Sequence, residues 1–303
     1  MKNHWKLGLL FLVAVLVMGT FAGCAAETSY KGATNFVEAS EVAALMEQDN
    51  VVVVDARYAE DYEKGHLAGS VNLNPKEKLM ISEPVKGMIP SKEMVEEVLG
   101  TNGISETDTV LIYGNHGGIY AARVWWTMKT YGHEDVRIIN GGEAAIVQAG
   151  LPLTKEMPML TEKTYTAKEL DADRYATKEE VEALIASEEE NCVILDTRSA
   201  AEYSEGFITN AVLYPHTKNY YADGTFKNVQ AITLDYKDIG IEKDTLVVAY
   251  CKSSVRATLT AALLEEAGFK KVKIYDGAWL EWSATGVVEK PETSAPITTQ
   301  DAS

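Results

Sequence analysis

The sequence predicts an α/β protein made of two similar domains, each a mostly parallel sheet with helices on both faces. Short apolar runs of strand length alternate with stretches that repeat apolar residues at helical spacing, which is typical of parallel sheets. The same order of elements also occurs twice along the chain. The expected strands are 51–54, 109–113, 136–139, 193–195, 245–250 and 272–275, and the expected helices are 41–47, 91–99, 121–130, 178–188 and 256–267.

The internal repeat defines the domain organisation. Residues 51–74 align without a gap with residues 192–215, and residues 108–146 align with residues 244–282 over the same length. Between the two halves lies a stretch with two prolines and no periodicity, which is typical of a linker. We therefore expect a tether at 24–34, a first domain at 35–150, a linker at 151–166, a second domain at 167–290 and a disordered tail at 291–303.

The beginning of the chain has the pattern of an export signal. Two lysines precede an uninterrupted apolar stretch, Leu7 to Met18, and small residues follow it. Ala22-Gly23-Cys24 resembles the lipobox of bacterial lipoproteins, with Phe21 where leucine is usual. This resemblance implies a signal peptide at 1–23, an extracytoplasmic location, and a lipid on Cys24 that anchors the protein to the bacterial cell membrane. The alternative is ordinary signal-peptide cleavage without a lipid.

The charge balance and the cysteine count narrow the class of protein. With 45 acidic and 28 basic residues the chain carries a net charge of −17, so nucleic acid is not an expected partner. No metal or cofactor is expected, because the five histidines are scattered and Gly114 to Gly118 lacks the Lys-Ser/Thr of a phosphate loop. The three cysteines do not form a disulfide framework, and Cys192, which begins an apolar strand, is expected to pack.

The stretch that carries chemistry begins at Cys251, where an apolar strand stops and an apolar-periodic helix starts. In such a loop the backbone N–H groups converge, and the positive end of the following helix favours an anion. Lys252 and Arg256 add two positive charges, so we expect Cys251 to ionise readily and to act as a nucleophile. The alternative is a core cysteine that only packs, against which the charged and polar neighbours in CKSSVR argue.

The corresponding loop of the first domain has no cysteine. Asn115 stands opposite Cys251, and Tyr120 stands opposite Arg256. Only the second domain is therefore expected to be catalytic. The adjacent Trp125-Trp126, at a helix position, is expected to pack one domain against the other.

Together the motifs resemble the tandem-domain rhodanese family of sulfurtransferases over nearly all of residues 36–285. In that family two similar α/β domains lie side by side, and only the second keeps the reactive cysteine. The matching segments are Asp55-Ala56-Arg57, Asp196-Thr197-Arg198, Gly65-His66-Leu67-Ala68-Gly69, AARVWW with Tyr131-Gly132-His133, and Val272 to Trp282.

The resemblance implies a sulfurtransferase reaction. Cys251 takes the outer sulfur of an anionic donor, thiosulfate or 3-mercaptopyruvate, as a persulfide and passes it to cyanide or a thiol. The loop N–H groups from Lys252 to Arg256 hold the persulfide, while Lys252 and Arg198 help to bind the donor. Asp55 and Asp196 are expected to be scaffold residues. The implied substrate-binding residues are Lys252, Ser253, Ser254, Val255, Arg256 and Arg198.

Two features leave undecided which residues bind the donor and which donor is preferred. Arg57 occupies the place of Arg198 in the domain without a cysteine, so a structural ion pair is the alternative role for Arg198. Ser254 stands where many members of the family carry glycine, and Lys252 and Arg256 match neither the thiosulfate-preferring nor the mercaptopyruvate-preferring loop fully.

Two other functions stay open. A phosphatase or arsenate reductase of the related Cdc25-like fold would resemble Cys-x5-Arg, one residue longer than the spacing from Cys251 to Arg256. A lipoprotein that carries or senses persulfide sulfur on Cys251 for a partner, without turning over small donors, is the non-enzymatic alternative.

Overall fold

The computed structural model describes residues 30–187 and 191–291. The predicted signal peptide at 1–23, Cys24 and all but the first residue of the predicted tail lie outside the described residues. Within the described ranges, no helix has the length and apolar character needed to cross a membrane.

Each half of the chain forms a five-stranded parallel sheet. The first sheet has the order β1-β6-β5-β2-β4, and the second has the equivalent order β8-β13-β12-β9-β11. The predicted α/β class with two parallel sheets is therefore confirmed. The first sheet comprises β1 (Phe36–Val37), β2 (Val51–Asp55), β4 (Val71–Asn72), β5 (Thr109–Tyr113) and β6 (Val136–Ile139). The second comprises β8 (Tyr175–Ala176), β9 (Cys192–Asp196), β11 (Val212–Leu213), β12 (Leu246–Tyr250) and β13 (Lys271–Tyr275).

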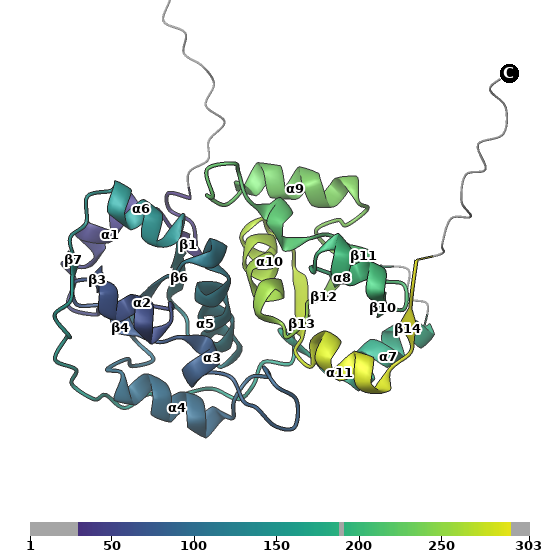
Figure 1. The fold of residues 1–303 in the computed structure, drawn as a ribbon, viewed down its shortest axis with the longest axis horizontal. Coiled ribbons are helices and arrows are strands. Elements are labelled where there is room, and N and C mark those ends of the chain that lie inside the picture. The colour runs from purple at the N-terminus through teal and green to yellow at the C-terminus, as the bar shows by residue number, and fades with distance from the viewer. Residues whose placement is uncertain (1–29, 188–190, 292–303) are drawn as a thin grey trace, which may run out of the picture.

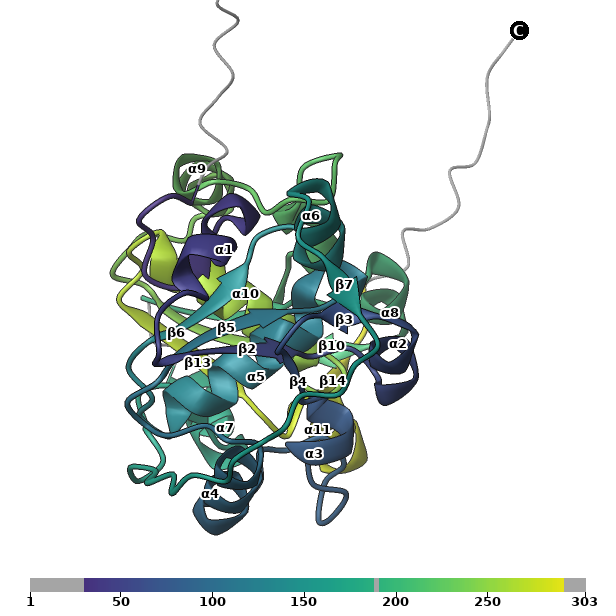
Figure 2. The same cartoon turned by 90° about the vertical axis from the view of Figure 1, so that its left-hand side faces the viewer.

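Helices cover both faces of the sheets, as Figure 2 shows for the first sheet, with α1 and α6 on one face and α4 and α5 on the other. Alternating strand residues explain this arrangement, because Val53 packs with the α1 and α6 side chains while Val54 faces the opposite cluster. The first-domain helices are α1 (Ala39–Leu45), α2 (Ala59–Lys64), α3 (Pro75–Lys78), α4 (Lys92–Thr101), α5 (Ile119–Thr130) and α6 (Gly142–Gln148). The second-domain helices are α7 (Lys178–Ser187), α8 (Ala200–Glu205), α9 (Val229–Asp238), α10 (Val255–Glu266) and α11 (Ala278–Thr285).

Short elements complete the chain. Two antiparallel pairs join β3 (His66–Leu67) to β7 (Leu153–Thr154) and β10 (Phe207–Ile208) to β14 (Val288–Glu289). Because β7 lies in the predicted linker, its pairing with β3 holds the start of that linker against the first domain. Two 3-10 turns are η1 (His116–Gly118) and η2 (His216–Asn219).

The domains meet through α5 and α10, which pack against each other between the two sheets (Figure 1). One hydrophobic cluster runs through this contact and includes Trp125 and Trp126 from α5 together with Leu259 and Ala262 from α10. The guanidinium of Arg174, in the second half, lies 5.9 Å from the centre of the Trp125 ring. The predicted packing of the tryptophan pair between the domains agrees with this arrangement.

The N-terminal segment already packs against the domains at Tyr30, which lies within the stretch 24–34 that was expected to be a tether. Tyr30 is buried, with its ring 4.7 Å from that of Phe36, and its hydroxyl donates to the carbonyl of Lys227 in the second domain. The backbone N–H of Asn35 donates to Glu266 at 2.7 Å. A large aromatic side chain in a stretch of small polar residues gains free energy by burial, and the domain junction supplies the site.

Candidate active site

The cysteine loop begins where β12 leaves the sheet. Cys251 follows the last strand residue, and α10 starts at Val255 after Ser254, which has the left-handed conformation with φ 50° and ψ 20°. The hydroxyl of Ser254 donates to the carbonyl of Tyr275 at 2.6 Å. Gly118 caps α5 with the same handedness, φ 75°. The family that the sequence resembles often carries glycine at the position of Ser254, and glycine adopts positive φ without steric cost.

Cys251 lies deep in the loop, with 1% of its surface exposed. Its carbonyl accepts a hydrogen bond from the N–H of Trp279 at 3.0 Å, and the carbonyl of Lys252 accepts from Leu280 at 3.1 Å. These two bonds fasten the loop to the first turn of α11. Lys252 is exposed, so the lysine and not the cysteine reaches the solvent.

Arg256 interacts with the thiol and with a carboxylate from another helix. It donates from Nη1 and Nη2 to the two oxygens of Glu202 on α8, at 2.7 and 2.8 Å. Burial by itself lowers the pKa of Arg256, but the hydrogen bond with Glu202 and the interaction with Cys251 raise it above the ordinary value. Arg256 therefore stays positively charged beside Cys251.

Glu202 is a site residue that the sequence reading missed. The hydrogen bonds from Arg256 are the largest cause that lowers its pKa, to about 2, against the effect of burial. The available signal was Ser199-x-x-Glu202, a capping box in which each side chain receives a hydrogen bond from the other residue's backbone. The motif predicts where a helix starts, but it does not predict that Arg256 binds Glu202.

Arg198 forms an ion pair with Asp196, the last residue of β9. Its guanidinium donates to the carboxylate of Asp196, at 2.6 to 3.0 Å, and to the carbonyl of Gly206 at 2.6 Å. Arg57 makes the equivalent bonds to Asp55 and Gly65 in the first domain. This shared geometry matches the structural ion pair, which was the alternative role for Arg198. Donor binding by Arg198 stays a prediction.

A cavity of about 700 Å³ lies between the two domains beside the cysteine loop. The second domain contributes Lys252, Ser253 and Leu280 to its wall. The first domain contributes the other lining residues, which are Tyr58, Lys76, Glu77, Met80, Ile81, Ser82, Lys86 and Gly87. The loop residues on either side of this cavity thus come from both halves of the repeat.

Arg123 of α5 holds the two walls of this cavity together. Its guanidinium donates to Asp276 at 2.7 Å and to the carbonyls of Gly87 at 3.0 Å and Ser254 at 3.4 Å. The second oxygen of Asp276 accepts from the N–H of Ile89 at 2.6 Å. Both side chains of the ion pair are fully buried. The first domain therefore supports the cysteine loop directly, although it has no cysteine of its own.

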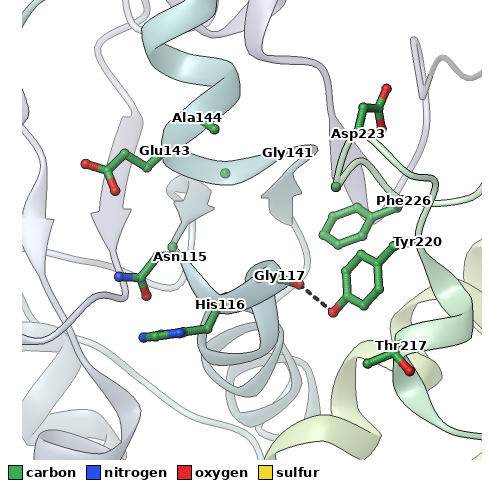
Figure 3. A pocket seen from close by; sticks show the side chains of 14 residues that line it. Asn115, His116, Gly117, Gly141, Glu143, Ala144, Thr217, Tyr220, Asp223 and Phe226 are labelled. Atoms are coloured by element: carbon green, nitrogen blue, oxygen red, sulfur yellow. Dashed lines mark hydrogen bonds between the residues drawn. The ribbon is translucent and has the colours of Figure 1, made fainter.

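The corresponding loop of the first domain borders a second cavity, of about 480 Å³ (Figure 3). Asn115 stands at the position of Cys251, and the rings of Tyr220 and Phe226 from the second domain lie across the loop. The hydroxyl of Tyr220 donates to the carbonyl of Gly117 at 2.7 Å. The loop that lacks the cysteine thus supports a contact between the domains.

Comparison with known proteins identifies the duplicated scaffold. The sequence matches the Rhodanese-like domain family twice, over residues 38–149 and 177–285. The chain belongs to the rhodanese family. A Haloferax volcanii protein named thiosulfate sulfurtransferase is 33% identical over 239 residues, covering 74% of this chain and 82% of that protein.

Two further proteins extend the comparison. The sulfur carrier protein TtuD of Thermus thermophilus is 31% identical over 239 residues, covering 73% of this chain and 83% of that protein. The crystal structure of SseA from Escherichia coli, described as a 3-mercaptopyruvate sulfotransferase with the rhodanese fold, has a TM-score of 0.74 and 25% identity, covering 81% of this chain and 99% of SseA. This chain is a tandem rhodanese-domain sulfurtransferase.

Proposed function

We propose that this rhodanese moves a sulfane sulfur from thiosulfate or 3-mercaptopyruvate to cyanide or a thiol through a persulfide on Cys251. The observation that carries the proposal is the pairing of Cys251 with Arg256 at the start of α10, in the one domain of the two that has a cysteine at this position. A thiolate next to a fixed guanidinium and a helix N-terminus is a nucleophile at neutral pH.

The first half-reaction follows from this arrangement. With thiosulfate, the Cys251 thiolate forms a bond to the outer sulfur, the sulfur–sulfur bond of the donor breaks, and its electron pair leaves with sulfite. The persulfide that remains carries one negative charge. Backbone N–H groups from Lys252 to Arg256 and the charge of Arg256 favour that anion. Lys252, exposed at the cavity, is placed to attract the dianionic donor.

Mass spectrometry of the intact protein tests this function. We expect the mass to rise by one sulfur atom after incubation with thiosulfate or 3-mercaptopyruvate, and to return to its starting value when cyanide releases thiocyanate. Cys251→Ser should keep the fold and gain no sulfur, whereas Cys192→Ser should behave as the parent protein. Sulfur transfer by Cys251→Ser would move the chemistry to another residue.

The second candidate is a sulfur carrier that works with a partner protein. It is favoured by the Thermus thermophilus relative named as a sulfur carrier. A carrier would accept sulfur on Cys251 but turn over slowly with small acceptors. Steady thiocyanate production from thiosulfate and cyanide, without any partner, would argue against it.

We also propose export and lipid anchoring through Cys24, supported by the lipobox-like Ala22-Gly23-Cys24. Radiolabelled fatty acid should be incorporated into the protein in bacterial cells, and the protein should be found with membranes. Cys24→Ala should lose the label and the membrane association. Retention of both would contradict the anchor.

A further inference from the structure

The interdomain cavity has a charge opposite to that of the chain as a whole. Its wall contains three lysines, Lys76, Lys86 and Lys252, and one acidic residue, Glu77, although the chain has 45 acidic and 28 basic residues. The cavity beside Asn115 differs, because Glu143 and Asp223 line it without a lysine or arginine. A concentration of cations in an acidic protein attracts anions to this cavity.

Lys76 is held at the cavity by two aromatic side chains. Its ammonium lies 6.0 Å from the ring centre of Tyr58 and 5.0 Å from that of Tyr120, and the two hydroxyls are 3.2 Å apart. Burial lowers the pKa of Lys76, but its hydrogen bonds with Tyr120 and Tyr58 outweigh that effect and raise it. Lys76 is therefore a fixed positive charge on the first-domain wall.

Lys86 is carried by a turn that touches the cysteine loop. The turn is closed by hydrogen bonds from Ile81 to Met88 at 3.0 Å and from Gly87 to Ile81 at 2.9 Å. Gly87 packs so closely on Ser253 that a Cβ atom added to it would lie 3.0 Å from the Ser253 Cβ. With Arg123 bonded to the Gly87 carbonyl, Lys86 has a defined place beside the cysteine loop.

The cavity is larger than a small donor needs, and its lysines lie on two opposite walls. Thiosulfate has five heavy atoms and two negative charges, and Lys252 is the lysine that the cysteine loop itself contributes to the cavity wall. The volume of about 700 Å³ corresponds to roughly 20 water molecules in the liquid. The two further lysines on the opposite wall are therefore available to a second, larger anion after the donor has left.

We propose that Lys76 and Lys86 bind the carboxylates of the sulfur acceptor, which is a low-molecular-weight thiol with at least two negative charges. This inference rests on the proposed function. The acceptor thiol first gives its proton to the outer sulfur of the persulfide anion. The resulting acceptor thiolate forms a bond to that sulfur, the bond from that sulfur to Cys251 breaks, and its electron pair returns to Cys251 as thiolate. The product is a protonated persulfide of the acceptor.

Acceptor selectivity tests the assignment. The persulfide enzyme is loaded with thiosulfate, and kcat/KM is measured with mercaptosuccinate, 3-mercaptopropionate and 2-mercaptoethanol, which carry two, one and no carboxylates. We expect Lys76→Met and Lys86→Met each to lower the ratio of kcat/KM for mercaptosuccinate to that for 2-mercaptoethanol by about fivefold. The effect on 3-mercaptopropionate should be intermediate.

Lys237→Met is the matched control, because this lysine is exposed on α9 away from the cavity wall. It should leave the selectivity ratio as in the parent protein. An unchanged ratio in both cavity variants would overturn the inference, as would an equal fall in kcat/KM for thiosulfate, which would assign the lysines to the donor. Failure of thiosulfate to load Cys251 would instead remove the proposed function, and this inference with it.

Discussion

At the scale of single residues, the charged neighbours of Cys251 differ in what they face. Arg256 is the charge that faces the thiol, and Glu202 fixes the position of that arginine through two hydrogen bonds. Lys252 instead lines the interdomain cavity. The loop thus has one cation beside the thiol and another at the cavity.

Charge reversal at Lys252 tests that division of roles. We expect Lys252→Glu to raise KM for thiosulfate about tenfold and to change kcat less, because the lysine attracts the donor but does not face the thiol. Steady-state kinetics at constant ionic strength measures both quantities. Lys237→Glu makes the same change in net charge at an exposed site and should leave KM unchanged. A KM for thiosulfate equal to that of the parent would place Lys252 outside the donor site.

The ion pair between Glu202 and Arg256 predicts a pH dependence of stability. The pKa of Glu202 falls from its ordinary value, near 4.5, to about 2 in the folded protein. Its contribution to stability is therefore complete above pH 4.5 and is lost as the pH falls towards 2. We expect Glu202→Gln to be less stable than the parent by about 1–2 kcal/mol at pH 6, after allowance for solvent screening, and the difference to shrink by pH 3.

Urea unfolding at both pH values measures that difference. Glu60→Gln is the control, because Glu60 pairs with Lys64 at an exposed site, where an ion pair contributes little. A difference between Glu202→Gln and the parent that stays constant from pH 6 to pH 3 would contradict the predicted linkage.

At the scale of elements, both halves use a left-handed residue to turn from the central strand into the following helix. Ser254 does this before α10, and Gly118 does it before α5. The first domain also has a close backbone contact at this loop. Gly142, at the start of α6, has φ +56° and lies against the carbonyl of Gly114. This packing brings α6 against the loop that contains Asn115.

Gly142→Ala should therefore destabilise the first domain. The new Cβ atom would lie 2.2 Å from the Gly114 oxygen, so the helix or the loop must shift, and the positive φ adds strain. We expect a loss of more than about 2 kcal/mol in the free energy of unfolding. Gly150→Ala also has positive φ but meets no atom within 4 Å, so its loss should be about 1 kcal/mol. Equal losses in urea unfolding would refute the steric argument.

At the scale of the whole molecule, the two domains share one core. The hydrophobic cluster around α5 and α10 is continuous, and the buried pair of Arg123 and Asp276 lies beside it. The same arginine donates to the carbonyl of Gly87 in the wall of the interdomain cavity and to that of Ser254 in the cysteine loop. The relative position of the domains is thus tied to the shape of the cysteine loop.

Removing both partners of this buried pair should cost less than the two single losses added together. Arg123→Met leaves an unpaired buried carboxylate, and Asp276→Leu leaves an unpaired guanidinium, so we expect each to lower the free energy of unfolding by about 3–5 kcal/mol. The double variant should lose clearly less than the sum of the single losses. Urea unfolding of the four proteins gives the coupling energy, and additive losses would show that the two side chains do not depend on each other.

Sequence reasoning found the parts of the site that are local in the chain. The order of strands and helices, the duplication, and the position of Cys251 at the end of a strand all follow from periodicity within short segments. The reading failed where partners come from distant segments. Arg256 and Glu202 are 54 residues apart, and Arg123 and Asp276 are 153 residues apart. Tyr30 was missed for the same reason, since its contacts lie in both domains.

The α/β class and the tandem repeat follow from the sequence, and so does the choice of Cys251 as the candidate nucleophile, because hydrophobic periodicity and residue type are properties of neighbours along the chain. The charges that surround Cys251 follow only from the tertiary structure. It pairs Arg256 with Glu202, holds Arg198 on Asp196, and brings Lys76 and Lys86 to the cavity of Lys252. Electrostatic interactions depend on distance in space, and the packing of α5 on α10 sets those distances.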